Sequence, residues 1–160
     1  MAEATKTDKE FMRLALALAR KNASSAEGGP FGAVVVYDGK VVGEGRNQVT
    51  TTNDPTAHAE VVAIREAGKK LGRFDLKGCV VYTSCEPCPM CLAAAYWARV
   101  DKVVYSATQN EAAAAGFDDA FLYEELAKHQ SERQLATIQL KTDDEDPFEV
   151  WLANPNRIPY

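Results

Sequence analysis

The chain has 160 residues, of which 46% are hydrophobic and 26% are charged, and its formal net charge is −5. This size and composition are typical of one globular domain, which buries enough surface to form a core without the help of disulfide bonds or a structural metal. No apolar run approaches the roughly 20 residues of a membrane span, and the polar segment MAEATKTDKE at the start matches no secretory or transit signal. We therefore expect a cytoplasmic protein with no membrane partner.

The distribution of charge argues against a nucleic-acid partner. No run of basic residues is longer than the pair Lys69-Lys70, whereas proteins that bind nucleic acid through its phosphates need a clustered positive surface. The acidic balance therefore favours a small-molecule substrate over a polynucleotide.

The first half of the chain predicts a helix, a hairpin and a second helix. Residues 8–21 carry an apolar stripe at helical spacing, and the β-branched run 32–37 predicts a strand. Asp38-Gly39 is a strong hairpin signal that leads into a second strand, KVVGEG. Asp54 as N-cap and Pro55 at the first helical position predict a helix that ends near Gly72.

Strands and helices alternate in the rest of the chain. Strand alternating with helix implies parallel pairing in a layered α/β sheet. We expect strands at 79–83, 102–106 and 135–140, and helices after Glu86-Pro87 and at 110–115, 119–128 and 146–153.

Three of the four cysteines fall within seven residues, at Cys85, Cys88 and Cys91. In a cytosolic chain such clustering indicates metal or redox chemistry rather than disulfides. Cys79 lies inside an apolar run and is interpreted as a small core residue.

Two short motifs, each at a predicted helix start, carry the chemistry: His58-Ala59-Glu60 and Pro87-Cys88-Pro89-Met90-Cys91. Together they match the H-x-E…P-C-x-x-C pattern of zinc-dependent deaminases. Cys88 and Cys91 are three residues apart and therefore share one helix face, and a helix N-terminus favours thiolate over thiol. With His58 as the third ligand, the fourth tetrahedral position is left for water, as a catalytic zinc requires. A metal in this setting lowers the pKa of its water toward about 7.

Glu60 is better placed as a general acid/base than as a metal ligand. It lies two residues after His58, about 200° around a regular helix. Both side chains can reach one site only if His58 occupies the irregular start of the first turn. Glu60 would then accept a proton from the water and deliver it to the substrate.

Other interpretations of the same residues stay open. A single C-x-x-C in an α/β protein is also typical of a redox pair. Cys85-Glu86-Pro87-Cys88 is a second C-x-x-C, and participation of Cys85 would give a closed structural zinc site of three cysteines and one histidine. The position of Cys85 at a strand end favours packing beneath the site.

At these residues the chain resembles the zinc-dependent cytidine/nucleobase deaminase superfamily, and GGPFGAV and AGFDD narrow the resemblance toward guanine and guanosine deaminases. It extends over most of residues 8–125, through GGPFGAVVV, NDPTAHAEVVAIREA, YTSCEPCPMC, AAAYWAR and AGFDDAF. The resemblance implies a three-layer α/β/α cytidine-deaminase-like fold with a mixed five-stranded sheet. It also implies one zinc ion per chain, held by His58, Cys88 and Cys91, with Glu60 as the proton shuttle.

The resemblance further implies which side chains meet the substrate. It assigns a second catalytic role to Asp119, in recognition of the base edge or in proton transfer to the leaving amine. It assigns substrate contacts to Phe31, Asn47, Ala59, Trp97 and Tyr160. From the residues alone, Phe31 and Trp97 can equally be core, Asn47 can cap a turn, and Asp118 or Asp119 can be only a helix N-cap.

The expected function is zinc-dependent hydrolytic deamination of guanine to xanthine and ammonia, as in purine catabolism. Guanosine deamination, tRNA adenosine deamination and a non-enzymatic structural zinc-binding interaction module are the alternatives. We expect a single domain over residues 1–160, with residues 145–160 as a C-terminal lid. The resemblance implies a homodimer, in which this lid can be domain-swapped.

Overall fold

A β-hairpin opens the sheet in the structure, a computed structural model that describes residues 5–160. β1 (Gly32–Tyr37) and β2 (Lys40–Arg46) pair antiparallel, with Tyr37 opposite Lys40. The turn residues Asp38 and Gly39 have φ angles of 47° and 69°, and two successive positive φ values are the requirement of a type I′ turn, which matches the twist of the strands. The predicted hairpin is confirmed.

The sheet has the order β2-β1-β3-β4. β3 (Cys79–Cys85) pairs antiparallel with β1, whereas β4 (Lys102–Ala107) pairs parallel with β3 after a crossover through α4 (Pro89–Trp97). The sheet is therefore mixed, as predicted.

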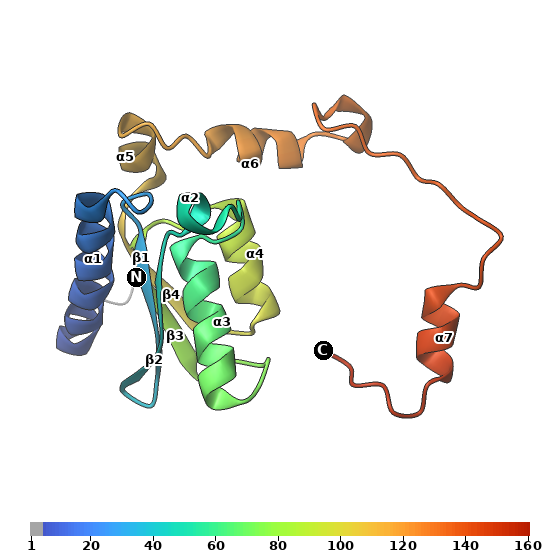
Figure 1. Cartoon of the computed structure of the whole chain (residues 1–160), viewed down its shortest axis with the longest axis horizontal. Coiled ribbons are helices and arrows are strands. Elements are labelled where there is room, and N and C mark those ends of the chain that lie inside the picture. The colour runs from blue at the N-terminus through green and yellow to red at the C-terminus, as the bar shows by residue number, and fades with distance from the viewer. Residues whose placement is uncertain (1–4) are drawn as a thin grey trace. The chain divides into compact units, whose positions relative to one another are not determined.

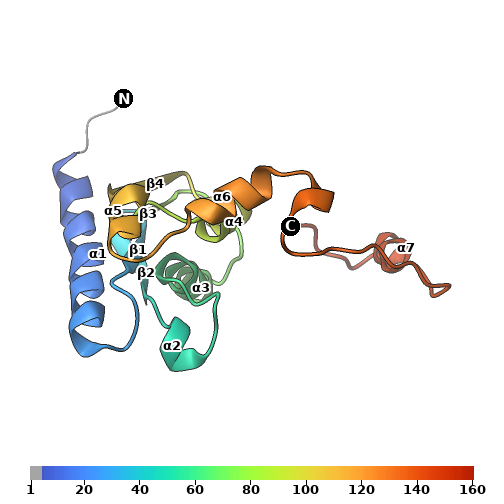
Figure 2. The same ribbon diagram turned by 90° about the horizontal axis from the view of Figure 1, so that it is seen from above.

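Helices cover both faces of this sheet. α1 (Lys6–Ser25) lies on one face, and α3 (Ala59–Leu71) and α4 lie on the other (Figure 1), an arrangement that Figure 2 shows from above. Along β1 the side chains alternate: Val34 and Val36 join the core under α1, and Ala33 and Val35 join the core under α3. Burial on both faces gives β1 its continuous apolar sequence, and the three-layer α/β/α prediction is confirmed.

The number of strands corrects the prediction of a five-stranded sheet. Within residues 5–160 the sheet has four strands, and no strand forms at 135–140. The large apolar residues of this segment, Leu135, Ile138 and Leu140, are 77%, 89% and 86% exposed. A strand exists only where a neighbour accepts its backbone hydrogen bonds, and no strand of the described residues pairs with this segment.

α3 lies directly on the backbone of β2. A Cβ atom added to Gly43 would lie 2.2 Å from the Ala63 carbonyl oxygen, and one added to Gly45 would lie 2.0 Å from that of Ala59. No side chain fits at either position. The two glycines therefore set the depth at which α3 packs, and with it the position of its first turn.

The start of α3 also differs from the prediction. The helix begins at Ala59 with His58 as N-cap, and not at Asp54. Asp54 instead accepts hydrogen bonds from the Thr56 amide (2.8 Å) and hydroxyl (2.6 Å), which stabilise a turn of the Asx type. The short helix α2 (Val49–Thr52) before it was not predicted.

The last third of the chain holds short helices, close to the predicted ranges. They are α5 (Gln109–Ala114), α6 (Ala120–Ala127), a 3-10 helix η1 (Gln130–Glu132) and α7 (Pro147–Ala153). The chain forms two compact units, one up to Tyr123 and the other Glu124–Tyr160, so the single domain with a lid at 145–160 stays a prediction. Among residues 5–160 we find no helix with the length and apolar character needed to cross a membrane.

Candidate metal centre and active site

Two helices begin beside the carboxyl end of β3 and present the predicted metal ligands. His58 is the N-cap of α3 and Cys88 is the N-cap of α4, and both have extended backbone angles, with ψ of 154° and 167°. Pro89 occupies the first turn of α4, where its fixed φ suits a helix start and its missing N–H costs nothing. The extended N-caps turn both side chains toward the space between the two helices.

Three donor atoms meet in that space. The Nδ1 atom of His58 lies 3.6 Å from the Cys88 sulfur and 3.5 Å from the Cys91 sulfur, and all three donor atoms lie within 4.8 Å of one another. Zinc–sulfur and zinc–nitrogen bonds of about 2.3 and 2.0 Å at a tetrahedral angle require a nitrogen–sulfur separation of about 3.5 Å. The three residues therefore fit a tetrahedral zinc ion, with one position left over.

The electrostatics of the thiols suit a cation. The pKa of Cys88 is lowered to about 4, first by its hydrogen bond with Cys91 and then by that with His58. The pKa of Cys91 is raised in turn, by the hydrogen bond with Cys88 and by burial. A site that already holds one thiolate beside an imidazole attracts a divalent metal.

The structure distinguishes the two overlapping C-x-x-C pairs. The Cys85 sulfur is directed at the carbonyl oxygen of Thr108, 3.7 Å away, and Cys85 is not part of the three-donor group. Burial raises the pKa of its thiol to about 11. Cys85 thus lies at the floor of the site as a neutral thiol, as its position at a strand end predicted.

Glu60 reaches the same site because His58 precedes the helix. Glu60 is buried, with 8% of the residue exposed. Its Oε1 atom accepts a hydrogen bond of 3.1 Å from the Thr83 hydroxyl, and its Oε2 atom accepts one of 3.4 Å from Cys91. Burial raises the pKa of Glu60. The His-x-Glu spacing requires a histidine at the irregular start of the helix, and His58 occupies that position.

A cavity of about 140 Å³ opens in front of these groups. Pockets for drug-sized ligands have roughly 300–1,000 Å³, so this one suits a smaller molecule. Its walls combine two aromatic rings with polar and ionisable groups. The lining residues are Phe31, Asn47, His58, Glu60, Cys85, Glu86, Cys88, Phe117 and Asp119.

Phe31 and Asn47 stand at the cavity as predicted. The ring of Phe31 meets that of Phe117 edge to face, with centroids 4.9 Å apart and an interplanar angle of 85°. Such a pair fixes the orientation of the Phe31 face. The Asn47 Oδ1 atom accepts weak hydrogen bonds from the amides of Gly29 (3.4 Å) and Val49 (3.3 Å). Asn47 therefore stabilises a turn and borders the cavity at once.

The two acids of the AGFDD motif have different surroundings. Asp118 is exposed, and its Oδ1 atom accepts a 2.9 Å hydrogen bond from the amide of Ala120 at the start of α6. Asp119 lines the cavity, and its pKa is raised by burial and by the negative charge of Cys88. The capping role thus belongs to Asp118, which leaves Asp119 free for a role in the site.

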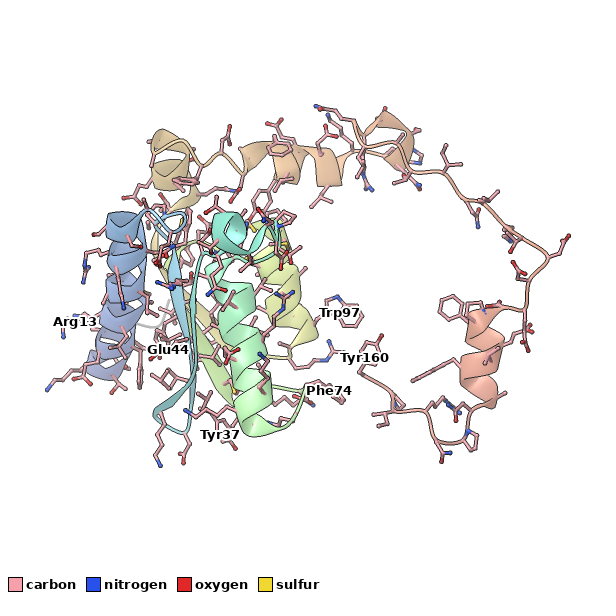
Figure 3. The ribbon with its side chains drawn as sticks, viewed as in Figure 1. Arg13, Tyr37, Glu44, Phe74, Trp97 and Tyr160 are labelled. Atoms are coloured by element: carbon pink, nitrogen blue, oxygen red, sulfur yellow. The ribbon has the colours of Figure 1, made fainter. Side chains whose placement is uncertain are left out.

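Three predicted substrate contacts do not line this cavity. Ala59 is fully buried. Trp97 is 62% exposed and its side chain extends outward from the end of α4 (Figure 3). Tyr160 belongs to the second unit, Glu124–Tyr160. Their roles stay predictions.

Three residues at the site were not singled out from the sequence. Phe117 and Glu86 line the cavity, and Thr83 holds Glu60. Phe117 and Glu86 lie inside the AGFDD and CEPC motifs, so their motif positions were an available signal. Thr83 lies within the apolar strand β3, and nothing in its sequence context marks a contact with an acid on another element.

The chain is similar over most of its length to a guanine deaminase. It is 51% identical to a guanine deaminase of Bacillus subtilis over 151 residues, which cover 94% of this chain and 97% of that protein. An X-ray structure of guanine deaminase from Bacillus subtilis superposes with a TM-score of 0.92 at 50% identity, over 95% of this chain and 98% of that one.

A second kind of relative is more distant. A tRNA-specific adenosine deaminase of Bacillus subtilis is 38% identical over 125 residues, which cover 78% of this chain and 77% of that protein. The family model described as the cytidine and deoxycytidylate deaminase zinc-binding region matches residues 5–107, the stretch that contains all three metal donors and Glu60. The chain therefore belongs to the cytidine and deoxycytidylate deaminase family of zinc-binding proteins.

Proposed function

We propose that this protein catalyses the hydrolytic deamination of guanine to xanthine and ammonia, with one zinc ion per chain. The observation that carries the proposal is the buried carboxyl group of Glu60 beside three metal donors, at the back of a small cavity with an aromatic wall. The similarity to a guanine deaminase over nearly the whole chain supports the choice of substrate.

Zinc bound by His58, Cys88 and Cys91 would supply an activated water molecule for attack on C2 of the base. Glu60 moves the protons. Thr83 engages its Oε1 atom, and Oε2 is the oxygen on the side of Cys91, so Oε2 is the one that accepts the proton from the attacking water. Its raised pKa brings the carboxyl group toward the working pH, which favours both acceptance and release of a proton.

The subsequent steps need two proton deliveries. Glu60 passes the first proton to N3 of the ring. The second proton comes from the hydroxyl group now on C2 and goes to the exocyclic amine, so that the C2–N bond breaks, ammonia leaves and C2 keeps a carbonyl oxygen. Asp119 borders the same cavity and has a raised pKa, so it either holds the base edge or assists the second delivery. The face of Phe31 orients the ring, and the side chain of Asn47 contacts the base edge.

The other enzymatic functions are less well supported. The small cavity favours a free base over guanosine, because a nucleoside brings a ribose as well. The net charge of −5 and the lower identity to tRNA adenosine deaminases oppose a polynucleotide substrate. A structural zinc module would have no need for a buried acid beside the metal donors, so Glu60 opposes that function too.

A cytoplasmic location belongs to the same proposal. All four cysteines lie within the described residues without a disulfide, and three of them lie at the site. Thiols in this state persist in a reducing compartment.

We also propose that the protein is a homodimer in which residues 145–160 close a substrate site. In the unit Glu124–Tyr160 several large apolar side chains are from 69% to 89% exposed: Leu135, Ile138, Leu140, Phe148, Ile158 and Tyr160. Apolar surface of this extent is typical of an interface. Light scattering coupled to size exclusion should give twice the chain mass, and a fully active monomer would refute this part of the proposal.

The test of the reaction is ammonia release from guanine, guanosine, adenine, cytosine and cytidine by zinc-loaded protein, measured side by side. Turnover of guanine alone is the expected outcome. A preference for guanosine would keep the zinc chemistry and overturn the substrate. No turnover of any of the five, with one zinc bound, would overturn the proposed reaction.

A further inference from the structure

A buried asparagine of α1 connects the helix to both loops that border the cavity. Asn22 is fully buried near the end of α1. Its Nδ2 group donates hydrogen bonds of 2.7 Å to the carbonyl oxygen of Gly29 and 2.8 Å to that of Asn47. One amide group thus holds two segments that are 18 residues apart in the chain.

The side-chain amide of Asn22 forms hydrogen bonds as a donor but not as an acceptor. Both N–H groups of Asn22 are used, whereas its Oδ1 atom is buried and has no hydrogen-bond partner within residues 5–160. An unpaired buried acceptor opposes folding, so an apolar side chain at this position would remove that cost. What an apolar side chain cannot supply is the pair of donors to the two loop carbonyls.

The two loops carry two of the predicted base contacts, Phe31 and Asn47, and both residues line the cavity. Their backbones are paired directly: the Asn47 amide donates to the Phe31 carbonyl oxygen at 3.1 Å, and the Phe31 amide donates to that of Gly29 at 2.8 Å. A Cβ atom added to Gly28 would lie 2.3 Å from the Asn47 oxygen and 2.9 Å from Asn22 Nδ2. The loops therefore pack on Asn22 without space for an added side chain.

We propose that Asn22 is a positioning residue of the substrate site, which it never touches. Its amide fixes the loop before β1 and the residue after β2, and through them it sets the separation of the Phe31 ring from the Asn47 side chain. Neither the metal donors nor Glu60 bond to Asn22. The inference rests on the proposed function, because it takes Phe31 and Asn47 as the groups that hold the base.

Two substitutions remove the pair of N–H donors without adding bulk. Asn22→Asp keeps the shape but places carboxylate oxygens against two carbonyl oxygens, and Asn22→Ser leaves one hydroxyl donor where the amide supplied two. We expect each variant to retain one zinc per chain and a kcat within about threefold of the wild type, while KM for guanine rises at least about tenfold. The zinc content reports on the metal site independently of activity.

The matched control is Tyr82→Phe in β3, which acts on the other end of α1. It removes the 2.6 Å hydrogen bond from the Tyr82 hydroxyl to Asp8, near the start of α1. This variant should lower Tm and leave KM for guanine unchanged, because it loosens α1 away from the two loops.

A double-mutant cycle tests the route of the effect. If Asn22 acts through Asn47, the KM effect of Asn22→Ser should shrink severalfold in an Asn47→Ala background, because coupled residues are not additive. Full additivity would overturn the inference, as would a KM within about twofold of the wild type in both Asn22 variants. Failure of both variants to fold would assign Asn22 to folding alone and would overturn it as well.

The proposed function is tested by the wild type in the same experiment. Wild-type turnover of guanine with unaltered KM in the Asn22 variants would refute only the positioning role. Absence of guanine turnover by the zinc-loaded wild type would refute the proposed function and the positioning role together.

Discussion

The hydroxyl of Thr83 donates a 3.1 Å hydrogen bond to the Oε1 atom of Glu60, so a residue of β3 holds an acid of the first turn of α3. Both groups are nearly inaccessible, at 1% and 8% exposure. The bond fixes one carboxylate oxygen and leaves the other on the side of the metal donors. A carboxyl group held in this way is ready to transfer a proton before substrate binds.

Replacement of Glu60 by Gln should abolish most of the turnover without loss of zinc. The amide keeps the shape of the side chain and can still accept from Thr83, but it cannot accept the proton of the water. We expect kcat for guanine to fall by roughly 10²–10⁴-fold with one zinc per chain. Near-normal turnover would refute the role of Glu60, and metal analysis of the same sample serves as its control.

Removal of zinc should abolish activity and reduce stability together. The three donors come from two helices that meet only in the folded chain, so metal binding is linked to folding. A chelator should stop guanine turnover and lower Tm, and added zinc should restore both. A His58→Ala variant should show the low Tm without any chelator. If the Tm of the chelator-treated wild type and the Tm of His58→Ala both equalled that of the untreated wild type, this linkage would be contradicted.

Asp119→Asn and Asp118→Asn form a matched pair of adjacent substitutions. Asp119 borders the cavity, and Asp118 bonds to the start of α6. The first variant should lower kcat/KM for guanine by about 10²-fold, whereas the second should stay within about twofold of the wild type, because an amide oxygen still caps the helix. Equal losses in the two variants would show that the segment, and not the Asp119 carboxyl group, matters.

Asp8 should make the stability depend on pH in the acid range. A hydrogen bond from Tyr82, followed by bonds from Thr5, lowers the pKa of Asp8 below its ordinary 3.8. Because the folded pKa is depressed, the unfolded chain binds a proton first as pH falls. The contribution of Asp8 is therefore fully present above about pH 4 and is lost progressively below it.

The measurement is urea unfolding of the wild type and Asp8→Asn at pH 7, 5 and 3. The difference in unfolding free energy should be constant between pH 7 and 5 and smaller at pH 3. Acid also releases zinc, but it does so from both proteins, so the difference isolates Asp8. A difference that grows toward pH 3 would reverse the sign and refute the assignment.

Local patterns predicted the hairpin of the sheet, the helices and the metal donors, because each of these depends mainly on residues that are close together in the sequence. Asp38-Gly39 specifies its turn by backbone preference alone. Asp54-Pro55 was misleading as a helix start because an Asx turn uses the same residue types as an N-cap. The strand predicted at 135–140 does not form because pairing depends on a neighbouring backbone, which the local sequence does not reveal.

Long-range contacts account for what the sequence did not reveal. Thr83 and Asn22 look like an ordinary strand residue and an ordinary helix residue, and their partners lie 23 and 25 positions away. No local pattern encodes such a pair, so their roles follow only from the folded chain.

The close packing of α3 on Gly43 and Gly45 limits which substitutions these two positions tolerate. A methyl group at Gly45 would collide with the carbonyl of Ala59, the residue between His58 and Glu60, and would lift the histidine away from its two cysteines. A saturation library selected for guanine utilisation should therefore be as depleted at these two positions as at the metal donors. Such a screen would rank two strand residues with no functional group, and no contact with metal or substrate, among the indispensable ones.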